Sequence, residues 1–133
     1  MSDVKHAAGL AYREAGGRSE RVALLVHGYP ESSYMWRHAL PALAAAGWQA
    51  VAPDLPGYGD SDPQPPATWE RHIEALDRFV CELDLGPVML VTHDWGVMIG
   101  LRWVPRITVF SSDPIIRNPH PSGGRRPRAR GST

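Results

Sequence analysis

The sequence predicts an α/β fold in which a mostly parallel sheet carries flanking helices. Short apolar runs that end in glycine or a polar turn alternate with longer segments in which apolar residues recur at helical spacing. Strands separated by helices in this order are typical of a parallel sheet, because each crossover helix returns the chain to the same end of the sheet. At 133 residues, of which 43% are hydrophobic, the chain can build one modest core.

The first part of the chain is predicted to hold three strands and a broken helix. The strands cover residues 10–16, 21–28 and 48–55, and the second of these, RVALLVHG, is apolar enough to be buried on both faces. The helical segment covers residues 33–47. Because Pro41 lacks an amide hydrogen, we expect a short helix to end before it and a second helix to start with Pro41 in its first turn.

The second part of the chain is predicted to continue as loop, helix, strand and helix. Residues 56–66 are rich in glycine, proline and aspartate and are expected to form a loop. A helix over residues 69–83 follows, with Thr68 as its N-cap. The next strand is VMLVT (88–92), the third that is apolar enough to be buried. Another helix begins at WGVMIGLRW. Asp94 therefore lies at the carboxyl end of a strand, where α/β sheets bind their ligands.

The stretch VTHDWGV places Asp94 in a tight turn from strand to helix. Such a turn lifts the side chain out of the sheet, and the amides that start the next helix face negative charge. The turn needs small residues two positions before and after the nucleophile, so Gly96 fits and Thr92 is large. A carboxylate can displace a leaving group from carbon and form an ester. Asp94 is a candidate nucleophile, although an aspartate before a helix is, taken alone, more often an N-cap.

Three separate stretches resemble the α/β-hydrolases of the haloalkane dehalogenase and epoxide hydrolase group. They are HGYPESSYMWR (27–37), DLPGYGDSD (54–62) and LVTHDWG (90–96), in the order and approximate spacing of that group. The resemblance covers about residues 10–103. It implies that the chain is the N-terminal portion of an α/β-hydrolase fold and acts on a small organic substrate.

The same resemblance implies roles for individual residues. Asp94 matches the nucleophile, and the amides of Trp95 and Tyr29 match the two oxyanion-hole donors. The indole of Trp95 also matches a halide-stabilising donor. The residues that support these turns are His27, Gly28, Pro30 and Gly96. A catalytic base role for His27 or His93 is a less favoured alternative, because the resemblance gives both histidines structural positions.

The choice between the two activities depends on small differences. SSYMWR, GDSD and Thr92 favour a haloalkane dehalogenase, in which aspartate displaces halide and water later hydrolyses the alkyl-enzyme ester. Tyr29 stands where many dehalogenases have an asparagine, and HGYPE is closer to the epoxide hydrolase pattern. An epoxide hydrolase-like chain is therefore the alternative.

Residues 104–133 are predicted to form an Arg/Pro-rich, disordered tail after a partial hydrolase domain, residues 1–103. The first 103 residues hold 13 acidic and 8 basic residues, whereas the tail holds one acid, Asp113, and six arginines. A base histidine and its acid partner have no match, since His120 corresponds to no histidine of the family. We therefore expect a truncated or frameshifted, inactive form that stops before the cap and the C-terminal strands.

Composition adds expectations about location and partners. The single cysteine, Cys81, and the lack of an apolar run of about 20 residues predict a cytoplasmic protein without a membrane span. The glycine loop lacks the lysine of a nucleotide-binding loop, and we expect no cofactor and no metal. A non-enzymatic role, in which the basic tail binds nucleic acid or an acidic partner, is the least favoured alternative, because the tail lacks interleaved aromatic residues.

Overall fold

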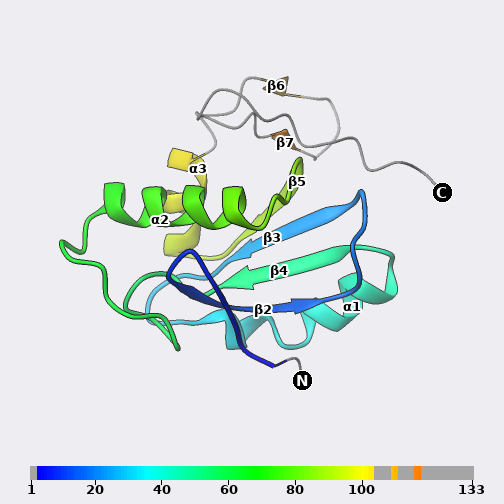
Figure 1. Cartoon of the computed structure of the whole chain (residues 1–133), viewed down its shortest axis with the longest axis horizontal. Coiled ribbons are helices and arrows are strands. Elements are labelled where there is room, and N and C mark those ends of the chain that lie inside the picture. The colour runs from blue at the N-terminus through cyan, green and yellow to red at the C-terminus, as the bar shows by residue number, and fades with distance from the viewer. Residues whose placement is uncertain (1–2, 104–108, 111–115, 118–133) are drawn as a thin grey trace.

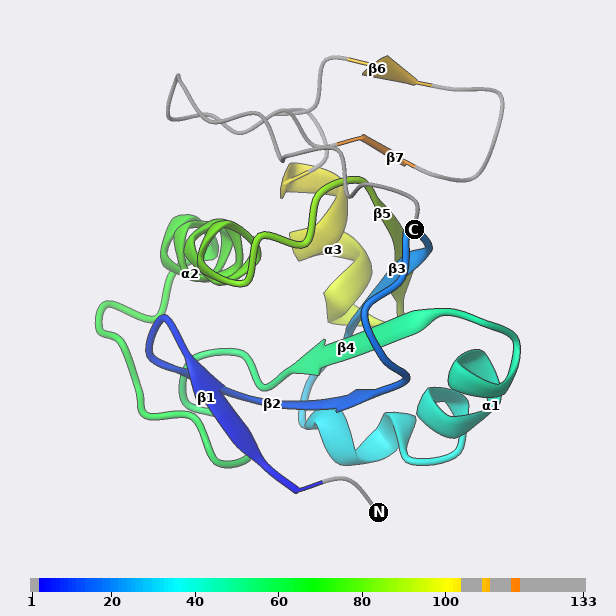
Figure 2. The same ribbon diagram turned by 45° about the vertical axis from the view of Figure 1, so that its right-hand side comes forward.

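The protein is built in three layers, with a sheet between two sets of helices (Figure 1). The computed structural model describes residues 3–103, 109–110 and 116–117, so the predicted tail lies outside the described residues except for two short strands. α2 and α3 cover one face of the sheet, and η1 and α1 cover the other (Figure 2). The helices are the 3-10 helix η1 (Ser33–Trp36), α1 (Ala39–Ala45), α2 (Trp69–Glu82) and α3 (Trp95–Trp103).

The sheet has the strand order β1-β2-β4-β3-β5-β7-β6. β3 pairs in parallel with β4 and with β5, and the other pairs are antiparallel. The strands are β1 (Lys5–Ala7), β2 (Leu10–Ala15), β3 (Val22–Val26), β4 (Gln49–Pro53), β5 (Val88–Thr92), β6 (Val109–Phe110) and β7 (Ile116–Arg117).

The prediction of an α/β fold with flanking helices is confirmed, and the sheet is mixed rather than mostly parallel. Its parallel part is the central trio β4-β3-β5, whose connections contain helices. β2 enters β3 without a crossover helix, so the chain reverses and β2 lies antiparallel to β4. The short strand β1, which the sequence did not predict, extends the sheet beyond β2.

Two hydrophobic clusters form because side chains alternate along the central strands. Val22, Leu24 and Val26 of β3 point to the α2 and α3 face, where Phe79 and Trp103 are fully buried. The opposite face is built from smaller side chains, among them alanines of β3 and β4, and packs against α1. Burial of each large apolar side chain contributes about 1.5–3 kcal/mol to the free energy of unfolding. The α2 and α3 side, which has the larger side chains, therefore forms the main part of the core.

The predicted start of α2 is confirmed by its capping geometry. The Thr68 hydroxyl accepts a hydrogen bond from the Arg71 amide at 3.2 Å, which begins α2. The proline-broken segment forms η1 and then α1, with Pro41 in the first turn of α1.

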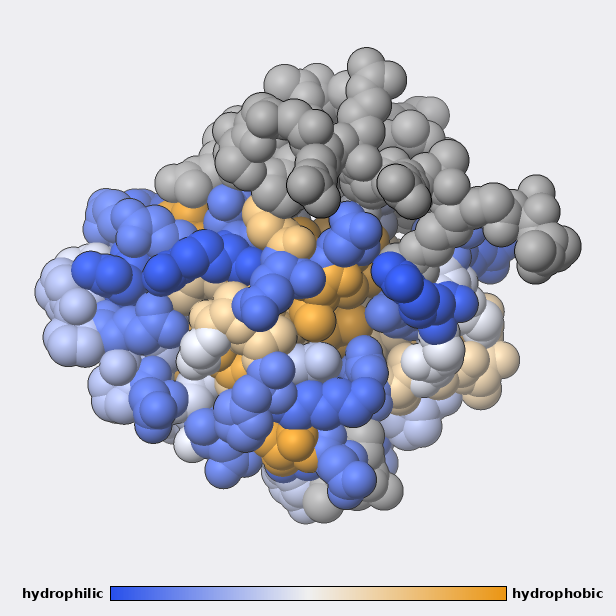
Figure 3. Space-filling view, in the orientation of Figure 1, coloured by the Kyte–Doolittle hydropathy of each residue, from blue (hydrophilic) through white to orange (hydrophobic). Residues whose placement is uncertain are grey.

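Hydrophilic side chains run along the outer face of α2, with hydrophobic side chains visible between this row and the strands (Figure 3). Within the described part of the chain, no helix has the length and apolar character needed to cross a bilayer.

β5 is less buried than the sequence predicted. Val88 is fully buried, but the other four residues of the strand are only half-buried. β3 pairs with β5 along its whole length on one side. On the other side, the described residues supply a single pairing, between Val88 and Ile116. The burial of a strand depends on its neighbours in space, which the composition of VMLVT does not specify.

Candidate active site

The turn that carries Asp94 joins the end of β5 to the start of α3, as predicted. Asp94 has a φ of +54°, in the left-handed region that residues other than glycine rarely adopt. The Gly96 amide donates to the His93 carbonyl at 2.9 Å, and the Val97 amide donates to the Asp94 carbonyl at 3.0 Å. These bonds hold the chain in a sharp turn. The Asp94 side chain is exposed directly before the positive end of α3.

Two glycines allow this turn to lie against the end of β3. A Cβ atom on Gly96 would lie 2.3 Å from the Val26 carbonyl oxygen, so α3 could not start this close to β3 with a larger residue. A Cβ atom on Gly28 would lie 2.7 Å from Asp94 Cβ and 2.9 Å from Asp94 Oδ2. The carboxylate of Asp94 therefore occupies the space that a side chain at position 28 would fill.

A third glycine explains how the turn accepts Thr92. A Cβ atom on Gly100 would lie 2.9 Å from Cγ2 of Thr92 and 3.0 Å from Cδ2 of Leu90. Gly100 is one turn and a half along α3, so the missing side chain leaves room for β5 beneath the helix. Gly100, eight positions later, thus makes room for the larger residue at position 92. The expectation of a small residue two positions before Asp94 did not take this glycine into account.

The loop after β3 lies beside the Asp94 turn, as expected for neighbouring parallel strands. The Tyr29 ring, 58% exposed, lies 5.8 Å from the Trp95 ring at an angle of 41°. Pro30 follows Tyr29, and the Glu31 amide donates to the Gly28 carbonyl at 2.9 Å to close the turn. As the first residue of α3, Trp95 has an amide without an intrahelical acceptor. The oxyanion roles of the Tyr29 and Trp95 amides stay predictions.

His27 is a structural residue in this geometry. Its ring is fully buried, Nε2 accepts a hydrogen bond from the Leu55 amide at 2.9 Å, and Nδ1 donates to the Gly28 carbonyl at 2.8 Å. Burial lowers the pKa of His27 from its ordinary value of 6.5, which favours the neutral ring. Because both nitrogens bind backbone groups, this histidine is not free to take a proton from water. The alternative role for His93, whose side chain is exposed, stays untested.

A pocket of about 400 Å³ adjoins the Asp94 turn. Gly28, Tyr29 and Trp95 form the side next to Asp94, which is itself not part of the lining. Aromatic rings from four separate segments make up much of the wall. These are Tyr29, Tyr58, Trp69 and Trp95. A wall with four such rings and one carboxylate, that of Glu70, suits a small organic molecule.

The fold agrees with comparisons to known proteins. Residues 22–114 match the alpha/beta hydrolase fold family, which is more than half of the chain. This protein belongs to the α/β hydrolase fold family. The match runs past residue 103, where the sequence predicted that the resemblance would end.

The relatives of this α/β hydrolase include both expected kinds of enzyme. A haloalkane dehalogenase of Psychrobacter cryohalolentis is 41% identical over 97 residues, covering 70% of this chain and 32% of the relative. Epoxide hydrolase 3 of Siraitia grosvenorii is 48% identical over 85 residues, covering 59% and 26%. The crystal structure of an epoxide hydrolase from Vigna radiata superposes with a TM-score of 0.72 at 33% identity, covering 77% and 35%. The chain spans between about a quarter and a third of the length of these relatives.

The site contains a buried carboxylate, Asp54, to which the sequence assigned no role beyond its place in the strand over residues 48–55 and in the motif DLPGYGDSD. Asp54 follows β4 directly and is 2% exposed. Its Oδ1 accepts from the Ser33 amide at 2.6 Å, and its Oδ2 accepts from the Asp60 amide at 3.0 Å. Asp54 thus ties the start of η1 to the glycine loop, whose Tyr58 lines the pocket. The informative signal was an aspartate directly after a buried strand, ahead of PGYGD.

Two further residues of the pocket wall were not predicted. Trp69 begins the predicted helix over residues 69–83, and its half-buried ring reaches the pocket from the start of α2. His72 lies one turn later, and burial lowers its pKa from 6.5. Its Nδ1 is buried without a hydrogen-bond partner, and among the described residues no hydrogen bond or ion pair joins this ring to a carboxylate.

Proposed function

We propose that Asp94 is the nucleophile of an α/β hydrolase of the haloalkane dehalogenase type. A carboxylate oxygen of Asp94 attacks the halogen-bearing carbon, the carbon–halogen bond breaks, and halide leaves as an ester forms on the enzyme. The observation that carries this proposal is the exposed carboxylate at φ +54°, directly before α3 and beside the aromatic pocket. The indole N–H of Trp95 is the candidate donor to the departing halide, and the start of α3 favours the developing charge.

Hydrolysis of the ester needs water activated by a base, and a carboxylate normally orients that base. Both histidines of the pocket wall, His27 and His72, lack a hydrogen bond to a carboxylate within the described residues. We therefore expect the ester on Asp94 to persist in this chain. Bromide release should stop at the molar amount of protein.

The test is incubation of the purified chain with 1-bromobutane, followed by intact mass, peptide mapping and bromide measurement. A butyl adduct on Asp94 is expected, and Asp94→Asn should abolish it. Asp84→Asn is the matched control, because Asp84 is also an exposed aspartate with positive φ, +51°, but follows the end of α2 and is not in the turn before α3. An equal adduct in Asp94→Asn would contradict Asp94 as nucleophile, and repeated turnover would contradict a persistent ester.

A specific observation supports epoxide opening as the second candidate. Tyr29 and Tyr58 both line the pocket, with ring centroids 6.2 Å apart at 88°. In this reaction Asp94 attacks an epoxide carbon, the carbon–oxygen bond opens, and a phenol donates its proton to the alkoxide. With styrene oxide, Tyr29→Phe and Tyr58→Phe should slow adduct formation and leave the reaction with 1-bromobutane unchanged. Loss of both reactions to the same degree would instead indicate a packing role for the two tyrosines.

A further inference from the structure

The wall beside Asp94 contains two stacked indole rings from different helices. The ring centroids of Trp69 and Trp95 lie 5.2 Å apart, with 27° between the ring planes. Trp69 is the first residue of α2 and Trp95 is the first residue of α3. Offset stacking at this distance is a favourable aromatic contact. The residue next to the proposed nucleophile is therefore held by a residue that is 26 positions earlier in the chain.

The two indoles are not equally constrained by the rest of the protein. Trp95 is 52% exposed, and its other aromatic neighbour is Tyr29, tilted by 41° at 5.8 Å. Trp69 is half-buried and packs against the main hydrophobic cluster, and its helix starts at the Thr68 cap. Trp69 is thus the anchored partner, and the orientation of Trp95 depends on it.

Arg102 completes the arrangement from the same helix as Trp95. Its guanidinium carbon lies over the Trp69 ring, 5.5 Å from the centroid. Arg102 is seven residues, or about two turns, after Trp95, so both side chains lie on one side of α3. Trp69 therefore makes contact with both Trp95 and Arg102, so two residues of α3 pack against the ring at the start of α2.

We propose that Trp69 is a positioning residue that fixes the Trp95 indole beside Asp94. This inference rests on the proposed function. A donor that is already oriented needs no reorganisation when charge develops on a leaving group, whereas a mobile donor does. Trp69 touches neither Asp94 nor the reacting carbon in this role and acts through Trp95.

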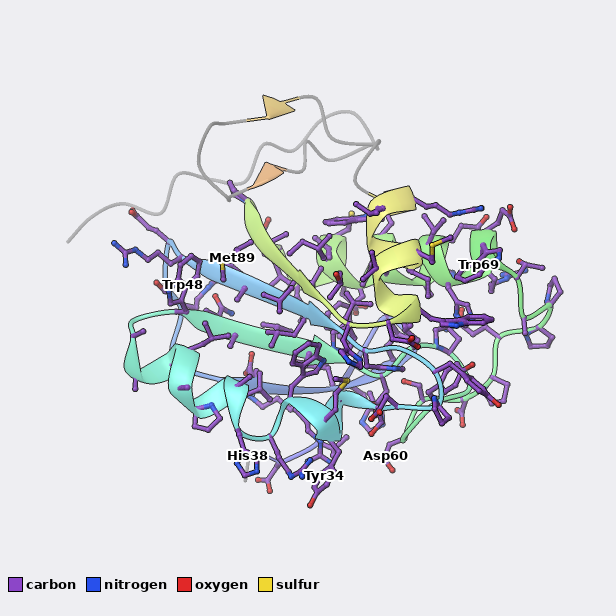
Figure 4. The ribbon with its side chains drawn as sticks, turned by 180° about the vertical axis from the view of Figure 1, so that it is seen from behind. Tyr34, His38, Trp48, Asp60, Trp69 and Met89 are labelled. Carbon is purple, nitrogen blue, oxygen red and sulfur yellow. The ribbon has the colours of Figure 1, made fainter. Side chains whose placement is uncertain are left out.

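The kinetic test compares rates of Asp94 alkylation by 1-bromobutane, measured by intact mass. Trp69→Leu should lower the rate about three- to tenfold, as expected for loss of one aromatic stack, and Trp69→Phe should keep part of it. Tyr34→Leu is the matched control, because Tyr34 also stacks with an arginine, Arg37 at 4.5 Å, and lies at η1, away from Trp69 (Figure 4). Tyr34→Leu should react at the wild-type rate.

A spectroscopic test reads the orientation without any chemistry. Two stacked indoles couple their transitions and give a paired positive and negative band in the far-ultraviolet circular dichroism spectrum. Trp69→Phe and Trp95→Phe should each remove this band, and Trp48→Phe should keep it. A band that survives Trp69→Phe would overturn the inference, and so would Trp69 variants that alkylate at the wild-type rate. If the wild-type chain gains no adduct on Asp94, the proposed function fails first and the positioning role fails with it.

Discussion

The two sides of the pocket are stabilised in different ways. The loops after β3 and β4 are held by buried polar side chains, since His27 and Asp54 each bind two backbone groups at full or nearly full burial. The β5 and α3 side has exposed apolar side chains, with Met98 at 47% and Leu101 at 59%, and an indole held by ring contacts. The comparison indicates that the first side fixes the backbone of the site, whereas the second side presents Asp94 and Trp95 on a more exposed surface.

The largest expected effect comes from removing the buried carboxylate on the first side. Asp54→Ala leaves the Ser33 and Asp60 amides without their acceptor, and we expect it to cost about 3 kcal/mol or more of unfolding free energy. Asp62→Ala, at an exposed aspartate in the same loop, should change little. Urea unfolding followed by tryptophan fluorescence measures both. Similar midpoints for the two variants would remove the proposed difference between the sides.

A somewhat smaller effect is expected where the second side meets the first. Gly96→Ala forces a methyl group to within 2.3 Å of the Val26 carbonyl oxygen, so α3 must shift. Overpacking of this kind costs about 1–3 kcal/mol, and the displaced turn should also slow alkylation of Asp94. Gly17→Ala is the control, because a Cβ atom there meets nothing within 4 Å. Unchanged midpoint and rate in Gly96→Ala would show that the junction is softer than its contacts indicate.

Acid should lower the stability of the fold, because two histidines of the pocket wall are buried and favour the neutral form. Burial lowers the pKa of His27 and of His72 below 6.5 in the folded protein, so the unfolded chain binds protons first as pH falls. The contribution of the two neutral rings to the free energy of unfolding is fully present above about pH 6.5. It is lost as the pH falls from there toward the lowered pKa values. Urea midpoints measured between pH 8 and 5 should follow this course, and His72→Gln should flatten it. A midpoint that rises on acidification would contradict the assignment.

The smallest effect is expected on the exposed face of α3. Leu101→Gln should change the free energy of unfolding by no more than about 0.5 kcal/mol, because the side chain is already mostly in water. The fully buried Leu76, changed to Ala, should cost about 2–5 kcal/mol. Chemical unfolding of both variants tests this contrast. A large loss in Leu101→Gln would mean that the α3 face is covered in solution.

Local patterns predicted most of the fold and the position of Asp94. Apolar spacing and the Thr68 cap located α2, and a strand followed by DWG located the turn, because these features depend on residues close together in the chain. The mixed sheet, the Asp54 network and the Trp69 stack were not predicted. Each depends on contacts across the chain, such as that between Ser33 and Asp54, and one sequence gives no information on which distant residues meet.

The ring of His27 offers a consequence beyond stability. Its Nδ1 proton is shared with the Gly28 carbonyl in a fully buried setting, directly beneath the backbone on which the Asp94 carboxylate lies. Such a proton exchanges slowly with water and gives an isolated, strongly downfield proton magnetic resonance. That single signal would report, without any substrate, whether the loop after β3 is docked against the loop after β4, whose Leu55 amide donates to the other nitrogen of the same ring.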